Sequence, residues 1–231
     1  MTDLFPISEP ERRAQLEAAQ AKALGLFDAI EKADLIIPGR DEKDIEEDIR
    51  ELAARDFGVS KHWHRRIVRS GPNSVTTAGD YPPPRVVEAD DIVYLDLGPV
   101  FEGWEADIGK SYALGSDPCK RALVADLPRV FETVQAHYRA DPHITGAALY
   151  AFAQEAAQAR GWHFGGEIAG HIIGEFAHSQ IPGDKALNRI GPQNSKAMSD
   201  PDDLGRPRHW ILEIHLVAPD RSFGGFYERL L

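Results

Sequence analysis

The chain has 231 residues, of which 42% are hydrophobic and 27% charged, a composition typical of a folded globular protein. Its net charge of -11 argues against a nucleic-acid partner, because binding to phosphates requires a concentrated basic surface. The sequence has neither an apolar run near the roughly 18 residues of a membrane span nor a signal-peptide core at its N-terminus. Its one cysteine, Cys119, excludes an internal disulfide. We therefore expect a cytoplasmic protein with no membrane partner.

The first part of the chain predicts two helices followed by strands. Apolar residues recur near the helical spacing over 9–34 and 42–55. Ser8 is a candidate N-cap of the first helix, and Gly58 ends the second. Strand-like runs follow at 65–70, 91–97 and 106–113.

The same order returns after Gly115, with helical patterns over 120–139 and 145–160 and strand-like runs at 166–173, 210–217 and 226–231. The polar segment 182–208 is rich in Pro and Gly and predicts a long surface loop, of a length often found covering active sites. The repetition predicts an α+β fold in which one domain, 1–231, consists of two related halves, about 1–115 and 116–231. A site between these halves would collect side chains from both.

Two aspartates are the strongest chemical signal in the first half. Asp96 and Asp107 stand eleven residues apart in strand-like runs, with a turn at Glu102 and Gly103 between them. In a hairpin, side chains of equal parity share one face, and paired strands lie about 5 Å apart. Buried carboxylates at that separation repel unless a proton or a cation lies between them, and a divalent metal is the usual cation. The alternative is that both are turn or surface residues.

The second half offers further ligands in apolar surroundings. His171 and His178 are seven residues apart near glycines that allow close backbone approach, although a single histidine is more often a packed core or surface group. Glu213 and Glu228 each interrupt an apolar strand, and the turn at 219–222 would place them on one hairpin face. Buried carboxylates must be paired, protonated or coordinated. Together with the aspartates, these oxygen and imidazole donors suit two adjacent divalent ions, with Mn, Co, Fe and Zn all allowed.

The order of these residues resembles the pita-bread metallohydrolases: methionine aminopeptidase, aminopeptidase P, prolidase and creatinase. The resemblance runs from about Ser70 to the C-terminus, and it implies a single-domain member with a curved antiparallel sheet between duplicated helix-helix-strand halves. It also implies roles for the metal ligands, in which Asp96 holds one ion, Asp107 and Glu228 bridge both, and His171 and Glu213 complete the second. By the same resemblance Glu213 would shuttle protons, and His178 would hydrogen-bond the developing oxyanion.

The match fails at a position near the substrate. Where the family's peptidases carry a histidine, this chain has Ala78, which places peptide hydrolysis in doubt. Candidates to fill the gap in the substrate pocket are Tyr81, Trp104 and His215, although core packing explains Trp104 and His215 equally well. The basic run 61–66 could recognise a carboxylate or phosphate of a ligand, or it could be a solvated face.

These observations favour a dinuclear metal-dependent hydrolase of a small amide or short peptide, similar to an aminopeptidase or dipeptidase. One alternative is a non-peptidase enzyme on the same scaffold, such as an amidinohydrolase or a lyase acting on a small zwitterion, and Ala78 favours it. The other is a binding protein without catalysis. The implied partners are a small-molecule or short-peptide substrate and, because members of this family often pair, a second copy of the chain.

Overall fold

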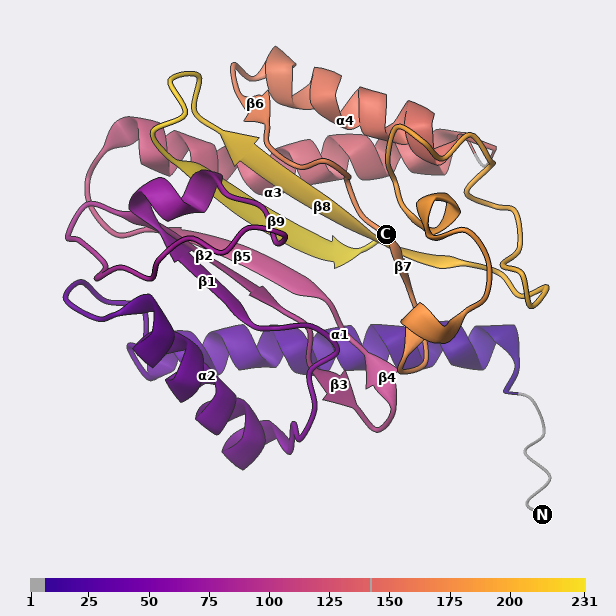
Figure 1. Ribbon diagram of the computed structural model, residues 1–231, viewed down its shortest axis with the longest axis horizontal. Coiled ribbons are helices and arrows are strands. Elements are labelled where there is room, and N and C mark those ends of the chain that lie inside the picture. The colour runs from indigo at the N-terminus through magenta and orange to yellow at the C-terminus, as the bar shows by residue number, and fades with distance from the viewer. Residues whose placement is uncertain (1–6, 142) are drawn as a thin grey trace.

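The computed structural model describes residues 7–141 and 143–231, in which two helices followed by strands occur twice along the chain (Figure 1). The first series comprises α1 (Glu9–Lys32), α2 (Glu42–Phe57), β1 (Ile67–Ser70), β2 (Ile92–Leu97), β3 (Val100–Phe101), β4 (Trp104–Glu105) and β5 (Ile108–Ala113). The second comprises α3 (Pro118–Ala140), α4 (Gly146–Ala159), β6 (His163–Phe164), β7 (Ile172–Ile173), β8 (His209–Val217) and β9 (Gly224–Leu230). Three 3-10 turns, η1 (Gly71–Val75), η2 (His178–Gln180) and η3 (Lys185–Asn188), lie between strands.

Local sequence signals account for the ends of the helices. Ser8 and Glu11 form the capping box that starts α1, as the sequence predicts for Ser8. Asp41 caps α2 by accepting a hydrogen bond from the backbone of Lys43. Gly58 then ends α2 with φ of 66°, a left-handed conformation that costs glycine little.

One antiparallel sheet contains strands from both series, in the order β1-β2-β5-β9-β8-β6, with β7 paired to β8. Its centre is the contact between β5 and β9, where Gly109 lies opposite Glu228. Neighbouring pairs fix the register on either side, since Asp96 lies opposite Gly109 and Glu213 lies opposite Glu228. The predicted carboxylate positions thus lie on neighbouring strands in the middle of the sheet.

The two faces of the sheet have different chemistry. Val93, Leu95 and Leu97 of β2 pack against α1 and α2, while alternate residues of β8, such as Leu212 and Ile214, pack against α3 and α4. Figure 1 shows these helix pairs beside the corresponding strands. Each fully buried aliphatic side chain contributes about 1.5–3 kcal/mol to stability. Side chains of the opposite parity, Tyr94, Asp96, Glu213 and His215, line a cavity on the other face.

Two predictions of secondary structure need correction. The strand predicted over 166–173 is reduced to the two residues of β7, since Gly170 has φ of 136° and passes so close to β8 that a Cβ would lie 2.1 Å from the carbonyl oxygen of Ile211. The turn predicted at Glu102 and Gly103 is present, and it joins β3 to β4, which form a separate two-stranded sheet. Segment 182–208 is not wholly on the surface, because it buries Ile190, Asn194 and Met198.

Among the described residues, every helix is either too short or too polar to span a lipid bilayer.

Candidate metal centre

Four carboxylates meet on the open face of the sheet. Asp96 projects from β2, Asp107 directly precedes β5, and Glu213 and Glu228 project from β8 and β9. Gly109 lies between Asp96 and Glu228 across the strands, and the ring of Phe226 packs directly over it, since a Cβ there would lie 2.4 Å from that ring. The structure therefore brings together the predicted acids of both halves.

His171 approaches the same group from the segment before β7. Its Nε2 lies 3.2 Å from Oδ2 of Asp107 and 3.9 Å from Oε1 of Glu213. Its Nδ1 donates a hydrogen bond of 2.6 Å to the carbonyl oxygen of Ile172, which fixes the ring and leaves Nε2 directed at the carboxylates. All five residues predicted as metal ligands thus line one cavity.

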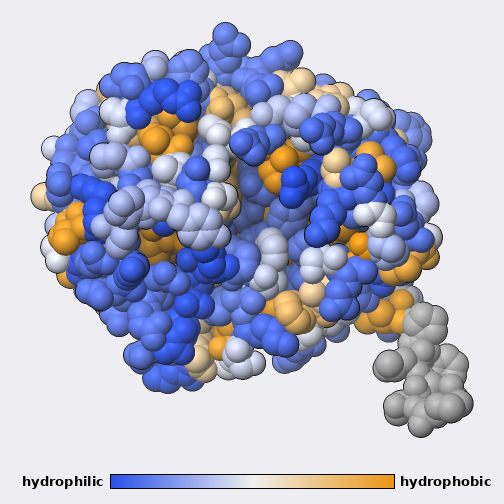
Figure 2. All heavy atoms as spheres, viewed as in Figure 1, coloured by the Kyte–Doolittle hydropathy of each residue, from blue (hydrophilic) through white to orange (hydrophobic). Residues whose placement is uncertain are grey.

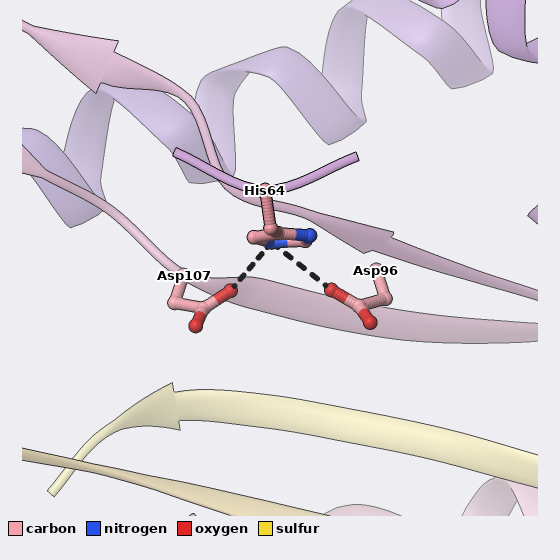
Figure 3. A group of neighbouring side chains, drawn as sticks. All are labelled: His64, Asp96 and Asp107. Carbon is pink, nitrogen blue, oxygen red and sulfur yellow. Dashed lines mark hydrogen bonds and ion pairs between the residues drawn. The ribbon is translucent and has the colours of Figure 1, made fainter. Parts of the chain in front are cut away.

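A sixth residue, His64, joins the group and was not predicted from the sequence. Figure 3 shows its ring, carried by the segment before β1, between Asp96 and Asp107. Its Nε2 lies 3.4 Å from Oδ1 of Asp96 and 3.2 Å from Oδ1 of Asp107. His64 lies in the run 61–66, whose positive charge suggested binding of a carboxylate or phosphate. The histidines of that run were not considered as metal ligands.

Burial and repulsion raise the pKa of most of the carboxylates. Burial, followed by repulsion from Asp107, raises the pKa of Asp96 to about 6 even though His64 opposes the change. Burial raises the pKa of Glu213 to about 7 against the attraction of His171. Burial and the neighbouring carboxylates also raise the pKa of Glu228 well above its usual value. The positive charges near these four carboxylates therefore do not balance their negative charge.

Asp107 and the two histidines behave in the opposite way. Burial would raise the pKa of Asp107, but hydrogen bonds from His171 and His64 lower it to about 2. Burial would lower the pKa of His64, but Asp96 and Asp107 raise it to about 9, and Asp107 has the same effect on His171. Without a bound cation, the two imidazoles are thus the nearest source of positive charge for four carboxylates.

The arrangement fits divalent metal ions. Two sets of donor atoms lie within 4.8 Å of one another: His64, Asp96 and Asp107 form one, and Asp107, His171 and Glu228 form the other. Oε2 of Glu228 is buried and has no hydrogen-bond partner in the part of the chain that the structure describes. A buried carboxylate oxygen of this kind requires a cation or a proton. Four carboxylates also match the charge of two divalent ions, and the absence of sulfur donors is typical of Mn, Co, Fe or Zn bound through oxygen and imidazole.

His178, the predicted catalytic histidine, lies beside this group, and a buried acid holds it there. Glu105 accepts hydrogen bonds from the backbone nitrogen of His178 at 3.0 Å and from its Nδ1 at 2.6 Å. Glu105 is 1% exposed. The imidazole thereby keeps Nε2 as the nitrogen available to a substrate. Sequence reasoning missed Glu105, although an acid two residues before Asp107 in a buried strand was a visible signal.

A cavity of about 720 Å³ contains the six clustered side chains and His178. Figure 2 shows the molecule hollowed near the middle of the corresponding face. Among the predicted pocket residues, Tyr81 and His215 line this cavity. Tyr81 is 80% exposed and stacks on the guanidinium of Arg65, whereas His215 is buried and its Nε2 donates to the carbonyl oxygen of Ser74. Trp104 does not line the cavity, because it packs half-buried against the core beside Leu16.

Ala78 also lines the cavity, so no imidazole extends from that position. Its carbonyl oxygen instead accepts a hydrogen bond of 2.6 Å from Nη2 of Arg65. Arg65, Lys185 and Arg189 add positive charge to the cavity wall, and Glu167 adds one acid to the four clustered carboxylates.

Comparison with known families gives one clear match. The sequence model described as "Metallopeptidase family M24" matches residues 14–199, which is most of the chain. No curated protein matches the sequence.

Solved structures show the same fold at low sequence identity. A recombinant prolidase from Thermococcus sibiricus aligns over 96% of this chain with a TM-score of 0.71 and 18% identity, and an X-Pro aminopeptidase from Thermotoga maritima over 96% with 0.73 and 22%. This chain spans only 56% and 58% of those two proteins. A methionine aminopeptidase from Rickettsia prowazekii aligns over 97% of this chain and 94% of its own length, with a TM-score of 0.72 and 14% identity. The predicted α+β pita-bread fold, an antiparallel sheet with flanking helices, is confirmed.

Proposed function

Since the chain belongs to metallopeptidase family M24, we propose that it is a dinuclear metal-dependent hydrolase that cleaves a small amide or a short peptide. The observation that carries this proposal is the convergence of four carboxylates and His171 on one cavity, with Oε2 of Glu228 buried and lacking a partner among the described residues. A protein that only bound a ligand would gain nothing from burying so much uncompensated charge.

Each acid would have its own part in holding the ions. Asp96 would bind one ion, His171 and Glu213 would bind the other, and Asp107 and Glu228 would bind both. Asp107 and Glu228 suit the bridging role because they are the most deeply buried of the four acids, 3% and 2% exposed. Glu228 lies at the centre of the sheet, and Asp107 directly precedes the neighbouring strand β5. When bound, two divalent ions supply a hydroxide nucleophile near neutral pH and polarise the carbonyl group to be attacked.

The remaining chemistry belongs to the side chains at the cavity wall. Glu213 is the acid suited to move a proton from the attacking water to the leaving amine, since its side chain is 18% exposed whereas that of Asp107 is 2% exposed. His178, with a proton on each ring nitrogen, would donate a hydrogen bond from Nε2 to the oxygen that becomes negative, while Nδ1 donates to the Glu105 carboxylate. The side chain would thus act as an imidazolium ion paired with Glu105. Glu105 therefore acts through His178 and has no contact with the substrate.

The cavity wall favours a small substrate with a free carboxylate. The cavity volume of about 720 Å³ lies in the range of sites that bind small molecules. Arg65 is held in place by its bonds to the carbonyl oxygens of Ala78 and Asp80 and by its stacking on Tyr81. A positioned guanidinium is suited to binding a carboxylate through two hydrogen bonds. A dipeptide satisfies both requirements, and so does a small zwitterion.

Ala78 supports a second candidate. With no imidazole at this position, the cavity lacks a group that the family's peptidases place near the scissile bond. An amidinohydrolase or a lyase acting on a small zwitterion would use the same ions, the same carboxylate-binding wall and a different reacting group.

A substrate screen separates these candidates. Protein loaded in turn with Mn, Co, Fe or Zn would be tested on dipeptides, on X-Pro dipeptides and on small amidines, with Glu213→Gln as the matched control. We expect metal-dependent cleavage of at least one dipeptide, abolished in the variant. Turnover of amidines alone would favour the second candidate, and a metal-loaded protein inactive towards every substrate would contradict hydrolysis.

A further inference from the structure

His64 and His171 make the same set of contacts. Nδ1 of His64 donates 2.6 Å to the carbonyl oxygen of the following residue, Arg65, and Nδ1 of His171 donates 2.6 Å to the carbonyl oxygen of the following residue, Ile172. The other nitrogen of each ring points to Asp107. Nε2 of His64 lies 3.2 Å from Oδ1, and Nε2 of His171 lies 3.2 Å from Oδ2. A histidine whose Nδ1 donates to a carbonyl group presents Nε2 as a metal ligand.

The separations around His64 match those between ligands of one ion. Two donors each about 2.1 Å from a metal are about 3.0 Å apart at a right angle and about 3.4 Å apart at the tetrahedral angle. Nε2 of His64 lies 3.2 Å from Asp107 and 3.4 Å from Asp96. Both distances exceed the roughly 2.7–2.9 Å of a charge-assisted hydrogen bond. They leave room for a cation that all three groups share.

The surroundings hold the ring of His64 in this position. Gly98 packs directly against it, since a Cβ there would lie 2.2 Å from Cδ2 and 2.4 Å from Nε2 of His64. Trp63 packs edge-on against the ring at 4.4 Å between ring centroids, and its Nε1 donates to the carbonyl oxygen of Ala106. The ring is therefore fixed by packing and by a hydrogen bond, as a preorganised ligand is.

We propose that His64 is a further protein ligand of the metal pair, binding the ion held by Asp96 and bridged by Asp107. This inference rests on the proposed dinuclear site and adds a donor to it. Each ion then has one imidazole, and each half of the chain contributes one histidine and two carboxylates. An imidazole on this ion favours Zn, Co or Fe over Mn, because nitrogen donors raise affinity for the later and softer metals.

The competing arrangement is an imidazolium ion that takes the place of the first metal. In that case His64 would neutralise Asp96 and Asp107 itself, and the protein would bind a single ion near His171. The two arrangements predict opposite effects of removing the ring. Without His64 a ligand is lost in the first arrangement, whereas a second metal position opens in the second.

The test compares metal binding by the wild type, His64→Ala and His62→Ala. His62 is the matched control, because it lies in the same segment but does not line the cavity. Metal-free protein is dialysed against Zn or Co, and bound metal is counted by mass spectrometry. We expect two ions in the wild type and in His62→Ala. In His64→Ala we expect one ion to bind with full affinity and the other to bind more weakly. Removing a residue that only hydrogen-bonds to a ligand lowers metal affinity by roughly 10–100-fold, so loss of the ligand itself should lower it by at least as much.

X-ray absorption of the Zn-loaded wild type gives an answer that does not depend on how the variant folds. An average of one imidazole per zinc supports His64 as a ligand, and an average of one half overturns it. Equal binding of two ions by His64→Ala and wild type would also overturn the inference and leave the proposed function intact. One ion in the wild type and two in His64→Ala would establish the imidazolium arrangement. No metal in the wild type would instead refute the proposed function, and the inference with it.

Discussion

The two halves of the chain contribute similar chemistry to one site through different local structures. The second half presents Glu213 and Glu228 directly opposite each other on adjacent strands. The first half presents Asp96 from β2, and Asp107 only after the chain has passed through the small β3-β4 sheet. The walls differ as well, since segment 76–81 forms one side and the much longer segment 182–208 contributes to the other. Regular strand pairing therefore places the carboxylates, while irregular segments place the groups that select a substrate.

The largest effect is expected from removing a bridging acid from either half. Asp107→Ala and Glu228→Ala should each release both ions and reduce turnover to background, because each acid would bind both metals and each is buried. Turnover and metal content measured on the same samples check this. If one of the two variants kept wild-type activity, the halves would not share a bridged site.

Loss of His178 should affect catalysis without affecting the metals. His178→Ala should lower turnover by roughly 10²–10³, the usual effect of removing one donor to an oxyanion. Its metal content should equal that of the wild type, because His178 bonds to Glu105 rather than to the four clustered acids. A parallel fall in metal content would mean that His178 is itself a ligand.

Glu105→Gln tests whether the acid positions His178. The amide keeps the size of the side chain but cannot accept two hydrogen bonds from His178 through two equivalent oxygens, so kcat should fall by about 10–100-fold. KM should stay the same, since Glu105 has no contact with the cavity. Steady-state kinetics separate the two constants, and a change in KM alone would contradict the positioning role.

Arg65→Ala sharpens the comparison between the two cavity walls. We expect KM to rise about 10-fold for substrates with a free carboxylate and kcat to change little. This pattern follows when the lost interaction is equally strong in the bound substrate and in the transition state. Substrates whose carboxylate is blocked as an amide provide the control and should be unaffected. Equal effects on both substrate classes would indicate that Arg65 acts only by supporting segment 78–80.

The smallest effect concerns two equivalent helix ends, one in each half. Gly58 follows α2 with φ of 66°, and Gly161 follows α4 with φ of 83°. Replacing either by Ala should cost about 1 kcal/mol, because a side chain disfavours the left-handed conformation, and should lower Tm by about 2–4 °C. Thermal unfolding followed by circular dichroism measures this, with unchanged kcat as the control. No loss of stability at either position would contradict the assigned conformations.

Strand parity and apolar context made the four acids candidates for a buried site, although a turn or surface position remained open for the two aspartates. Asp96, Asp107, Glu213 and Glu228 stand in buried runs whose alternation determines the face they occupy, and this information is local to each strand. Family resemblance then related them to one another. Parity with Glu213 also made His215 a candidate for the cavity wall, whereas Tyr81 was a candidate to fill the gap left at Ala78.

The groups held by irregular backbone could not be found in this way. His64 precedes β1 in a segment without periodicity. Its position depends on packing against Trp63, the preceding residue, and against Gly98, which is distant in sequence. Glu105 reaches His178 across 73 positions of sequence. Trp104 was a candidate for the cavity, with core packing as an equal alternative, and the structure shows it in β4, packed against the core beside Leu16.

The most direct test of the dinuclear site is the metal content of the wild-type protein. Untagged protein purified without oxygen would be measured by mass spectrometry, before and after incubation with Mn, Co, Fe or Zn. Four converging carboxylates with His64 and His171 predict close to two ions per chain. Protein that remains free of metal under all of these conditions would contradict the account and favour a binding protein that uses the same fold.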